Sequence, residues 1–200
     1  MQLNFNELKM HLPAPYKAGA EEGMRRIVAE SNQNYPMPKA QLAYVLATAW
    51  HESAGWMQPV REGAWRYGPN YTDANAIAAV NSLYAKGMIH VNYALPDKVT
   101  HKSYYGRGLV QITWHDNYKA FGDLLNLDLV NNPDLALEWP VTLKILFIGM
   151  RDGLFRQGHS LAQIKSPDDW FDARDIINSD KRKNGMKIAT TAAAFYAALN

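Results

Sequence analysis

Hydrophobic side chains recur along most of this chain at the three- and four-residue spacing of an α-helix. Within 41–54, one face of a helical wheel carries Leu42, Val45, Leu46, Ala49 and Trp50. Pro38 before this segment and Gly55 after it are start and stop signals. The same spacing predicts further helices over 72–86, 115–125, 140–153, 170–177 and 187–199, and one or two shorter helices over 7–30, interrupted by Pro13 and Pro15.

Strand patterns are scarce in this sequence. Only 89–93 and 109–114 combine strand-forming residues with alternation. No internal repeat, low-complexity tract or Gly/Ser-rich linker divides the chain. We therefore expect residues 1–200 to form a single, mainly α-helical (α+β) domain, with a small, partly β lobe over about 58–114.

Composition and charge fit a globular enzyme. Hydrophobic residues make up 48% of the chain and aromatic residues 12%, which excludes a disordered protein. The net charge of +2 is too small for a typical nucleic-acid binder. Its basic residues concentrate near the C-terminus, at Lys181, Arg182, Lys183 and Lys187. Such a cluster is typical of a solvated helix start, and attraction to an anionic cell envelope is the alternative.

The chain contains no cysteine, so neither a disulfide framework nor a thiolate zinc site can form. The first residues lack the charged-then-apolar pattern of a signal peptide, and no run approaches the roughly 20 apolar residues of a membrane span. We expect a monomeric protein made in the cytoplasm, without stable membrane insertion, that leaves the cell by a separate export route.

Glu52 is the first candidate for acid/base chemistry. On the helical wheel it falls beside Val45, at the edge of the apolar face and near the helix end. Burial and the negative end of the helix dipole would both raise the pKa of its carboxyl, as a general acid requires. The alternative is an ordinary surface glutamate. A zinc-protease motif is excluded, because Gly55 stands where His-Glu-x-x-His requires a second histidine.

The segment 104–114 is the second candidate. Gly106 and Gly108 allow a ligand to approach the backbone closely. If 109–114 is extended, Gln111 and Thr113 share one face, where they suit a sugar amide or a water molecule. A tight turn before a strand is the alternative interpretation of the glycines.

Together these segments resemble glycoside hydrolase family 19, the chitinase-like family to which many phage endolysins belong. The run 51–56 resembles its His-Glu-(Ser/Thr) motif, and 104–113 matches its Tyr-Tyr-Gly-Arg-Gly-x-x-Gln-x-(Ser/Thr) signature at every fixed position. The resemblance implies a lysozyme-like bilobal fold, an inverting mechanism without metal or cofactor, and Glu52 as proton donor. It also implies that Thr113 orients the attacking water and that the substrate-binding residues include Tyr105, Gln111, Asn117 and Tyr118.

An inverting mechanism needs a second carboxylate that activates water on the far side of the sugar. The spacing of phage-type members points to Glu62, whereas the longer plant spacing falls close to Asp73. Glu62 precedes Trp65 and Tyr67, aromatic residues suited to line a cleft, and these surroundings favour Glu62 over Asp73. However, 63–68 departs from the phage pattern, so both candidates stay open.

The run 173–178 resembles a late Arg-x-Ile-Asn-Gly motif of the same family, with one extra residue and Ser179 in place of glycine. By that resemblance Asn178 binds substrate and Arg174 orients a catalytic carboxylate, which we expect to be the base. A surface ion pair of Arg174 with Asp172 or Asp175 is the alternative.

The sequence thus predicts an endolysin-type glycoside hydrolase that cleaves β-1,4 bonds in the glycan strands of bacterial peptidoglycan. A chitinase acting on chitin and a catalytically inactive glycan-binding protein on the same scaffold are the alternatives.

Overall fold

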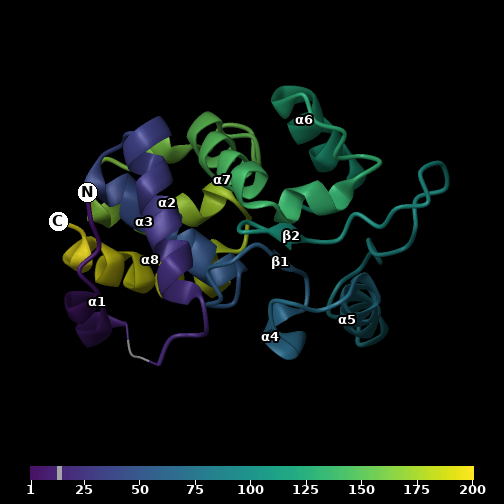
Figure 1. Cartoon of the computed structure of the whole chain (residues 1–200), viewed down its shortest axis with the longest axis horizontal. Coiled ribbons are helices and arrows are strands. Elements are labelled where there is room, and N and C mark those ends of the chain that lie inside the picture. The colour runs from purple at the N-terminus through teal and green to yellow at the C-terminus, as the bar shows by residue number, and fades with distance from the viewer. Residues whose placement is uncertain (13–14) are drawn as a thin grey trace.

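The computed structural model describes residues 1–12 and 15–200, and it is mainly helical (Figure 1). Its α-helices are α1 (Phe5–His11), α2 (Ala20–Asn34), α3 (Lys39–Glu52), α4 (Ala64–Tyr67), α5 (Asp73–Ala85), α6 (His115–Leu125), α7 (Trp139–Asp152) and α8 (Lys181–Ala198). Its 3₁₀ helices are η1 (Pro133–Leu137), η2 (Leu161–Gln163), η3 (Pro167–Trp170) and η4 (Asp172–Ile176). The expected mainly α class is confirmed. The predicted interruption at Pro13 lies outside the described residues.

The predicted helix boundaries agree best with the observed ones where a helix has one apolar face. The predicted 115–125 is α6, while 41–54, 72–86 and 140–153 correspond to α3, α5 and α7 with small shifts. The predicted 170–177 is instead split between η3 and η4. The last helix begins at Lys181 rather than at 187, because its first turns are polar and carry no hydrophobic periodicity.

Both predicted strands are wrong. The single sheet within the described residues pairs β1 (Val60–Arg61) with β2 (Arg107–Gly108) in antiparallel register. After β2 the chain turns and returns, so that Arg107 and Ile112 exchange backbone hydrogen bonds of 3.2 and 3.0 Å. Gln111 has a φ of 53° and Trp114 a φ of 76°. These left-handed conformations break the alternation that an extended 109–114 would have.

The main core surrounds α3. Every residue from Leu42 to Ala49 is buried, because α3 packs along α8 and also contacts α2 and α7. The apolar stripe on the helical wheel was therefore too narrow a description of this helix. Its C-terminal residue, Glu52, follows this buried stretch and lines the cleft toward the small lobe.

A second, smaller hydrophobic cluster lies on α4, α5 and the loops around them. Its buried members are Val60, Ala64, Tyr71, Ala76, Val80, Ala94 and Tyr105. Figure 1 shows α4 and α5 together at one end of the molecule, away from α1 and α8. The cluster falls within the span 58–114 predicted for the small lobe, but this region is chiefly helix and loop. None of the helices described here combines the length and the apolar character needed to cross a membrane.

The close approach of α2 to the loop after α3 yields a test of this packing. A Cβ added at Gly23 would lie 1.7 Å from the backbone oxygen of Met57. We expect Gly23→Ala to lower the free energy of unfolding by about 2 kcal/mol or more, since backbone must move to relieve the clash. Urea denaturation measures this change.

Helix propensity alone predicts the opposite sign, a gain of about 1 kcal/mol when alanine replaces glycine within a helix. The exposed Ala29, also on α2, provides the matched control: Ala29→Gly should cost about 1 kcal/mol by propensity alone. A Gly23→Ala protein as stable as the parent would show that α2 does not pack this closely.

Candidate active site

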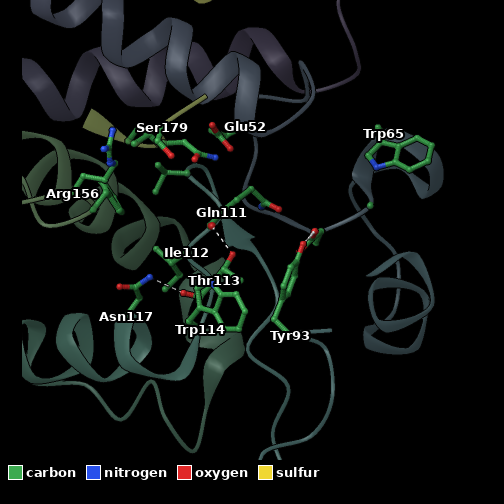
Figure 2. Close-up of a pocket in the computed structure, with 16 residues that line it drawn as sticks. Glu52, Trp65, Tyr93, Gln111, Ile112, Thr113, Trp114, Asn117, Arg156 and Ser179 are labelled. Atoms are coloured by element: carbon green, nitrogen blue, oxygen red, sulfur yellow. Dashed lines mark hydrogen bonds between the residues drawn. The ribbon is translucent and has the colours of Figure 1, made fainter. Parts of the chain in front are cut away.

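One cleft between the main core and the small lobe collects most of the predicted site residues (Figure 2). Its volume is about 550 Å³. The predicted residues that line it are Glu52, Glu62, Gln111, Thr113, Asn117 and Asn178. Segments far apart in the sequence therefore meet at a single cavity.

Glu52 reaches the cleft from the last position of α3, with its side chain only 15% exposed. Arg174 Nη1 donates a hydrogen bond of 2.6 Å to its Oε1. Burial raises the pKa of the Glu52 carboxyl, and this effect outweighs the nearby guanidinium, which acts in the opposite direction. Glu52 therefore has the environment predicted for an acid that retains its proton.

Arg174 is buried between two carboxylates, with 3% of its side chain exposed. It donates to Asp180 through Nε and, at 3.2 Å, through Nη2. Because Asp180 neutralises much of the guanidinium charge, Arg174 orients Glu52 without forcing it to ionise. The negative charge of Asp180 also acts directly to raise the pKa of Glu52.

Two expectations for Arg174 are wrong. It does not contact Glu62, the candidate base, because its side chain is directed at the end of α3. It also forms no surface pair with Asp172 or Asp175. Lys181 pairs with both of these acids, and Arg156 donates to Asp175 at 2.8 Å.

Glu62 enters the cleft directly after β1. The Tyr93 hydroxyl donates to its Oε1, and the Gly106 N–H donates to its Oε2 at 3.0 Å. Burial raises the pKa of the Glu62 carboxyl, while these two hydrogen bonds favour the ionised form. Figure 2 shows Glu52 on one side of Gln111 and Tyr93, the partner of Glu62, on the other.

Asp73, the alternative second carboxylate, does not line this cleft. It accepts hydrogen bonds from the Tyr105 hydroxyl and, at 3.2 Å, from Arg107 Nη2. Its side chain is 54% exposed and borders a different cavity of about 620 Å³. The placement of these two carboxylates favours Glu62, and its role as base stays a prediction.

Three polar side chains form the cleft floor and direct their donors to the backbone. Gln111 Nε2 donates to the Val60 and Gly108 oxygens at 2.8 and 3.0 Å. Thr113 Oγ1 donates to the Gln111 oxygen at 3.0 Å, and Asn117 Nδ2 donates to the Thr113 oxygen at 2.7 Å. Within the described residues no hydrogen bond uses Gln111 Oε1 or Asn117 Oδ1. The floor therefore presents acceptor oxygens, which suit the hydroxyl and amide N–H donors of a sugar.

The predicted substrate contacts of Tyr105 and Tyr118 are wrong, because both side chains are fully buried. The Tyr105 ring centre lies 3.8 Å from the Arg107 guanidinium carbon. Tyr118 accepts from Arg107 Nη1 at 3.1 Å and donates to the Tyr105 oxygen at 2.8 Å. These tyrosines hold the motif segment in place. Of the two aromatics after Glu62, Trp65 lines the cleft, whereas Tyr67 packs beside Tyr71.

Sequence analysis did not identify several residues of the site. Tyr93 lies 5.2 Å from Trp114 between ring centres, and together they form an aromatic wall of the cleft. Trp114 is the last residue of the segment 104–114 and could have been assigned to the site on that ground. Tyr93 lies in the predicted strand 89–93, which gave no reason to place it in a cleft. Asp180 and Arg156 lie outside the motif segments themselves, although their partners Arg174 and Asp175 belong to the run 173–178. Across residues 1–12 and 15–200, no three His, Cys, Asp or Glu side chains are grouped to hold a metal ion.

Comparison with known proteins identifies the family of this chain. Residues 29–147 match the family model of the class I chitinases, glycoside hydrolase family 19. Chitinase 11 of Oryza sativa subsp. japonica is 48% identical over 58 residues, which are 29% of this chain and 22% of that protein. Endochitinase 2 of Gossypium hirsutum is 34% identical over 105 residues, 51% of this chain and 32% of that protein. This chain thus spans less than a third of the length of these plant relatives.

The fold is similar to that of chitinase C from Streptomyces griseus, with a TM-score of 0.55 and 18% identity over 95% of this chain and 73% of that one. The family match includes Glu52, Glu62 and the cleft floor, whereas Arg174 and Asn178 lie beyond it and are assigned to the site by their geometry. Because the family model matches more than half of its residues, this chain belongs to glycoside hydrolase family 19, the class I chitinases.

Proposed function

We propose that this protein hydrolyses β-1,4-glycosidic bonds by an inverting acid/base mechanism, and that its substrate is bacterial peptidoglycan, as for an endolysin. One observation carries the reaction type: Glu52 and Glu62 are both buried carboxyls with raised pKa values, and both open into the same cleft. Aromatic walls and acceptor oxygens in that cleft suit a glycan strand.

In this mechanism Glu52 is the proton donor. Its Oε1 is held by Arg174, which leaves the other oxygen available to protonate the glycosidic oxygen as the bond to the leaving sugar breaks. The raised pKa keeps Glu52 protonated before the reaction. Arg174 then stabilises the carboxylate that remains after the proton has left.

Glu62 is the proposed base. A water molecule attacks the anomeric carbon from the opposite side of the sugar and passes its proton to Glu62. The Tyr93 and Gly106 donors hold both oxygens of Glu62 and favour its ionised form. Thr113 Oγ1 donates to backbone and can accept a hydrogen bond from that water, which would orient the attack.

Chitin is the second candidate substrate. The named plant relatives and the Streptomyces enzyme are chitinases, and chitin shares the β-1,4 linkage and N-acetyl groups with peptidoglycan. Peptidoglycan differs from chitin in the carboxyl groups that its strands carry, so an assay on both polymers decides between the two candidates.

The proton-donor assignment predicts that Glu52→Gln lowers kcat by at least about 100-fold, because glutamine cannot supply the proton. Release of reducing ends from peptidoglycan and from chitin measures this loss, with circular dichroism to check the fold. Glu22→Gln, at an exposed position of α2, is the matched control and should retain the parent's activity.

Three outcomes of that assay separate the candidates. Cleavage of peptidoglycan by the parent supports the proposed substrate, and cleavage of chitin alone supports the second candidate. A parent protein that binds either glycan without cleaving it would instead be the inactive glycan-binding form. Equal activity of Glu52→Gln and the parent would remove Glu52 from the mechanism.

The pairing of Arg174 with Asp180 predicts a pH effect. Asp180 raises the pKa of Glu52, so Asp180→Asn should lower that pKa and let Glu52 lose its proton at a lower pH. The alkaline limb of the kcat–pH profile should therefore move to lower pH. The acid limb should stay in place, because it reflects ionisation of Glu62, whose pKa does not depend on Asp180.

Asp172→Asn provides the control, since Asp172 is exposed and pairs with Lys181 rather than with Arg174. It should leave both limbs unchanged. An alkaline limb that stays in place or moves upward in Asp180→Asn would mean that the charge of Asp180 does not set the proton affinity of the donor.

A further inference from the structure

A second cavity of about 380 Å³ adjoins the cleft at Trp65, which lines both. We call it the side pocket. Its other walls include Lys17, Trp50, His51, Ala54, Lys187 and Thr191. His51, which lines the side pocket, directly precedes Glu52 on α3, and Trp65 is the residue that lines both cavities.

The side pocket is cationic. Lys17 and Lys187 line it, and none of its described lining residues carries a carboxylate. Lys17 Nζ donates to the Ala54 oxygen at 2.6 Å and lies 4.7 Å from the centre of the Trp56 ring, which fixes this ammonium at the pocket wall. Lys187 is exposed on α8 and forms no ion pair with any residue that the structure describes.

The neighbouring groups preserve this positive charge. Lys183 lies one turn before Lys187 on the same face of α8, and it too is exposed. Burial lowers the pKa of His51 to about 4, and Arg174 and Lys187 act in the same direction against the smaller opposing effect of Asp180, so the imidazole is neutral near pH 7. The lysines therefore set the sign of the potential here, and an anion is the complementary ligand.

A neutral glycan offers no anionic group with which these lysines could pair. Chitin carries hydroxyl and acetamido groups only. Peptidoglycan alternates such a sugar with one whose lactyl ether ends in a carboxyl, which is either free or joined to a stem peptide that bears carboxylates of its own. A sugar bound in the cleft near Trp65 would carry such a substituent toward the side pocket, which adjoins the cleft at that residue.

We propose that the side pocket binds a carboxylate carried by a substituent of the glycan strand seated in the cleft, and so selects anionic peptidoglycan over neutral chitin. This inference rests on the proposed function and specifies its substrate. Trp65 forms the boundary that the substituent crosses, and Lys17 and Lys187 bind its charge at the far side.

Binding by an inactive protein tests the pocket separately from catalysis. In a Glu52→Gln background, Lys187→Gln and the double variant Lys17→Gln/Lys187→Gln are compared by calorimetry. The ligands are chitohexaose, peptidoglycan glycan strands with stem peptides, and the same strands after an amidase has removed the stem peptides. We expect the double variant to bind anionic strands about fivefold more weakly and chitohexaose unchanged. Lys144→Gln, an exposed lysine of α7 that lines no described pocket, is the matched control.

The ligands also identify the carboxylate. A loss on amidase-treated strands assigns the lactyl carboxylate, and a loss confined to intact strands assigns the stem peptide; either result supports the pocket. Added salt should diminish the difference between variant and parent, because exposed charges are screened. An equal loss on chitohexaose, or no loss on either anionic strand, would overturn the inference. Failure of the proposed function would show differently, as a parent protein that does not cleave peptidoglycan.

Discussion

The buried guanidinium of Arg107 joins the two hydrophobic clusters, and the shape of the cleft depends on it. Only 2% of its side chain is exposed, and a buried charge of this kind is stable only when its donors are satisfied. Nε donates to Asp134 at 2.7 Å on the side of the main core, and Nη2 donates to Asp73 at 3.2 Å in the small lobe. Arg107 also exchanges backbone hydrogen bonds with Ile112, so the same residue fixes the turn that carries Gln111 and Thr113 into the cleft. The segment 104–114 thus connects the two hydrophobic clusters as well as forming the cleft floor.

The guanidinium of Arg174 is also shared between two carboxylates, and its role is to orient Glu52. A proton donor must be oriented by a strong hydrogen bond, yet an adjacent cation would normally lower its pKa and remove the proton. Because Asp180 also binds Arg174, Glu52 receives the geometry of an ion pair with only part of its electrostatic effect. Burial then determines the direction of the pKa shift, which is upward. Orientation and proton affinity are separated in this way by one additional carboxylate, six residues after the arginine.

Most of the helical architecture could be predicted from the sequence, since periodicity reports the local contact of each helix with the core. The helix His115–Leu125 has one apolar face, and both of its ends were predicted correctly. The polar first turns of α8 were not predicted. The strand expected over 109–114 failed because the left-handed backbone of Gln111 has no signature in a residue other than glycine. Glu52 and the cleft floor were proposed from contiguous motifs, and Glu62 from its spacing after Glu52. Tyr93, the partner of Glu62, and Asp180, the partner of Arg174, were not identified, because these contacts are made in the folded chain and lie outside any motif.

The two carboxylates illustrate why tertiary contacts decide the chemistry. Both glutamates are partly buried, Glu52 at the end of the long helix α3 and Glu62 after the two-residue strand β1. Glu62 accepts two uncharged hydrogen bonds, one from a phenol and one from a backbone amide, which spread over both of its oxygens. Glu52 accepts a single charge-assisted bond on one oxygen and keeps the other toward the cleft. A carboxyl with one free oxygen can deliver a proton directly to a bound sugar, while one held at both oxygens is better suited to remain ionised and attract the proton of a water. The number and charge of the donors that tertiary packing brings to each group thus support the proposed roles of Glu52 as acid and Glu62 as base.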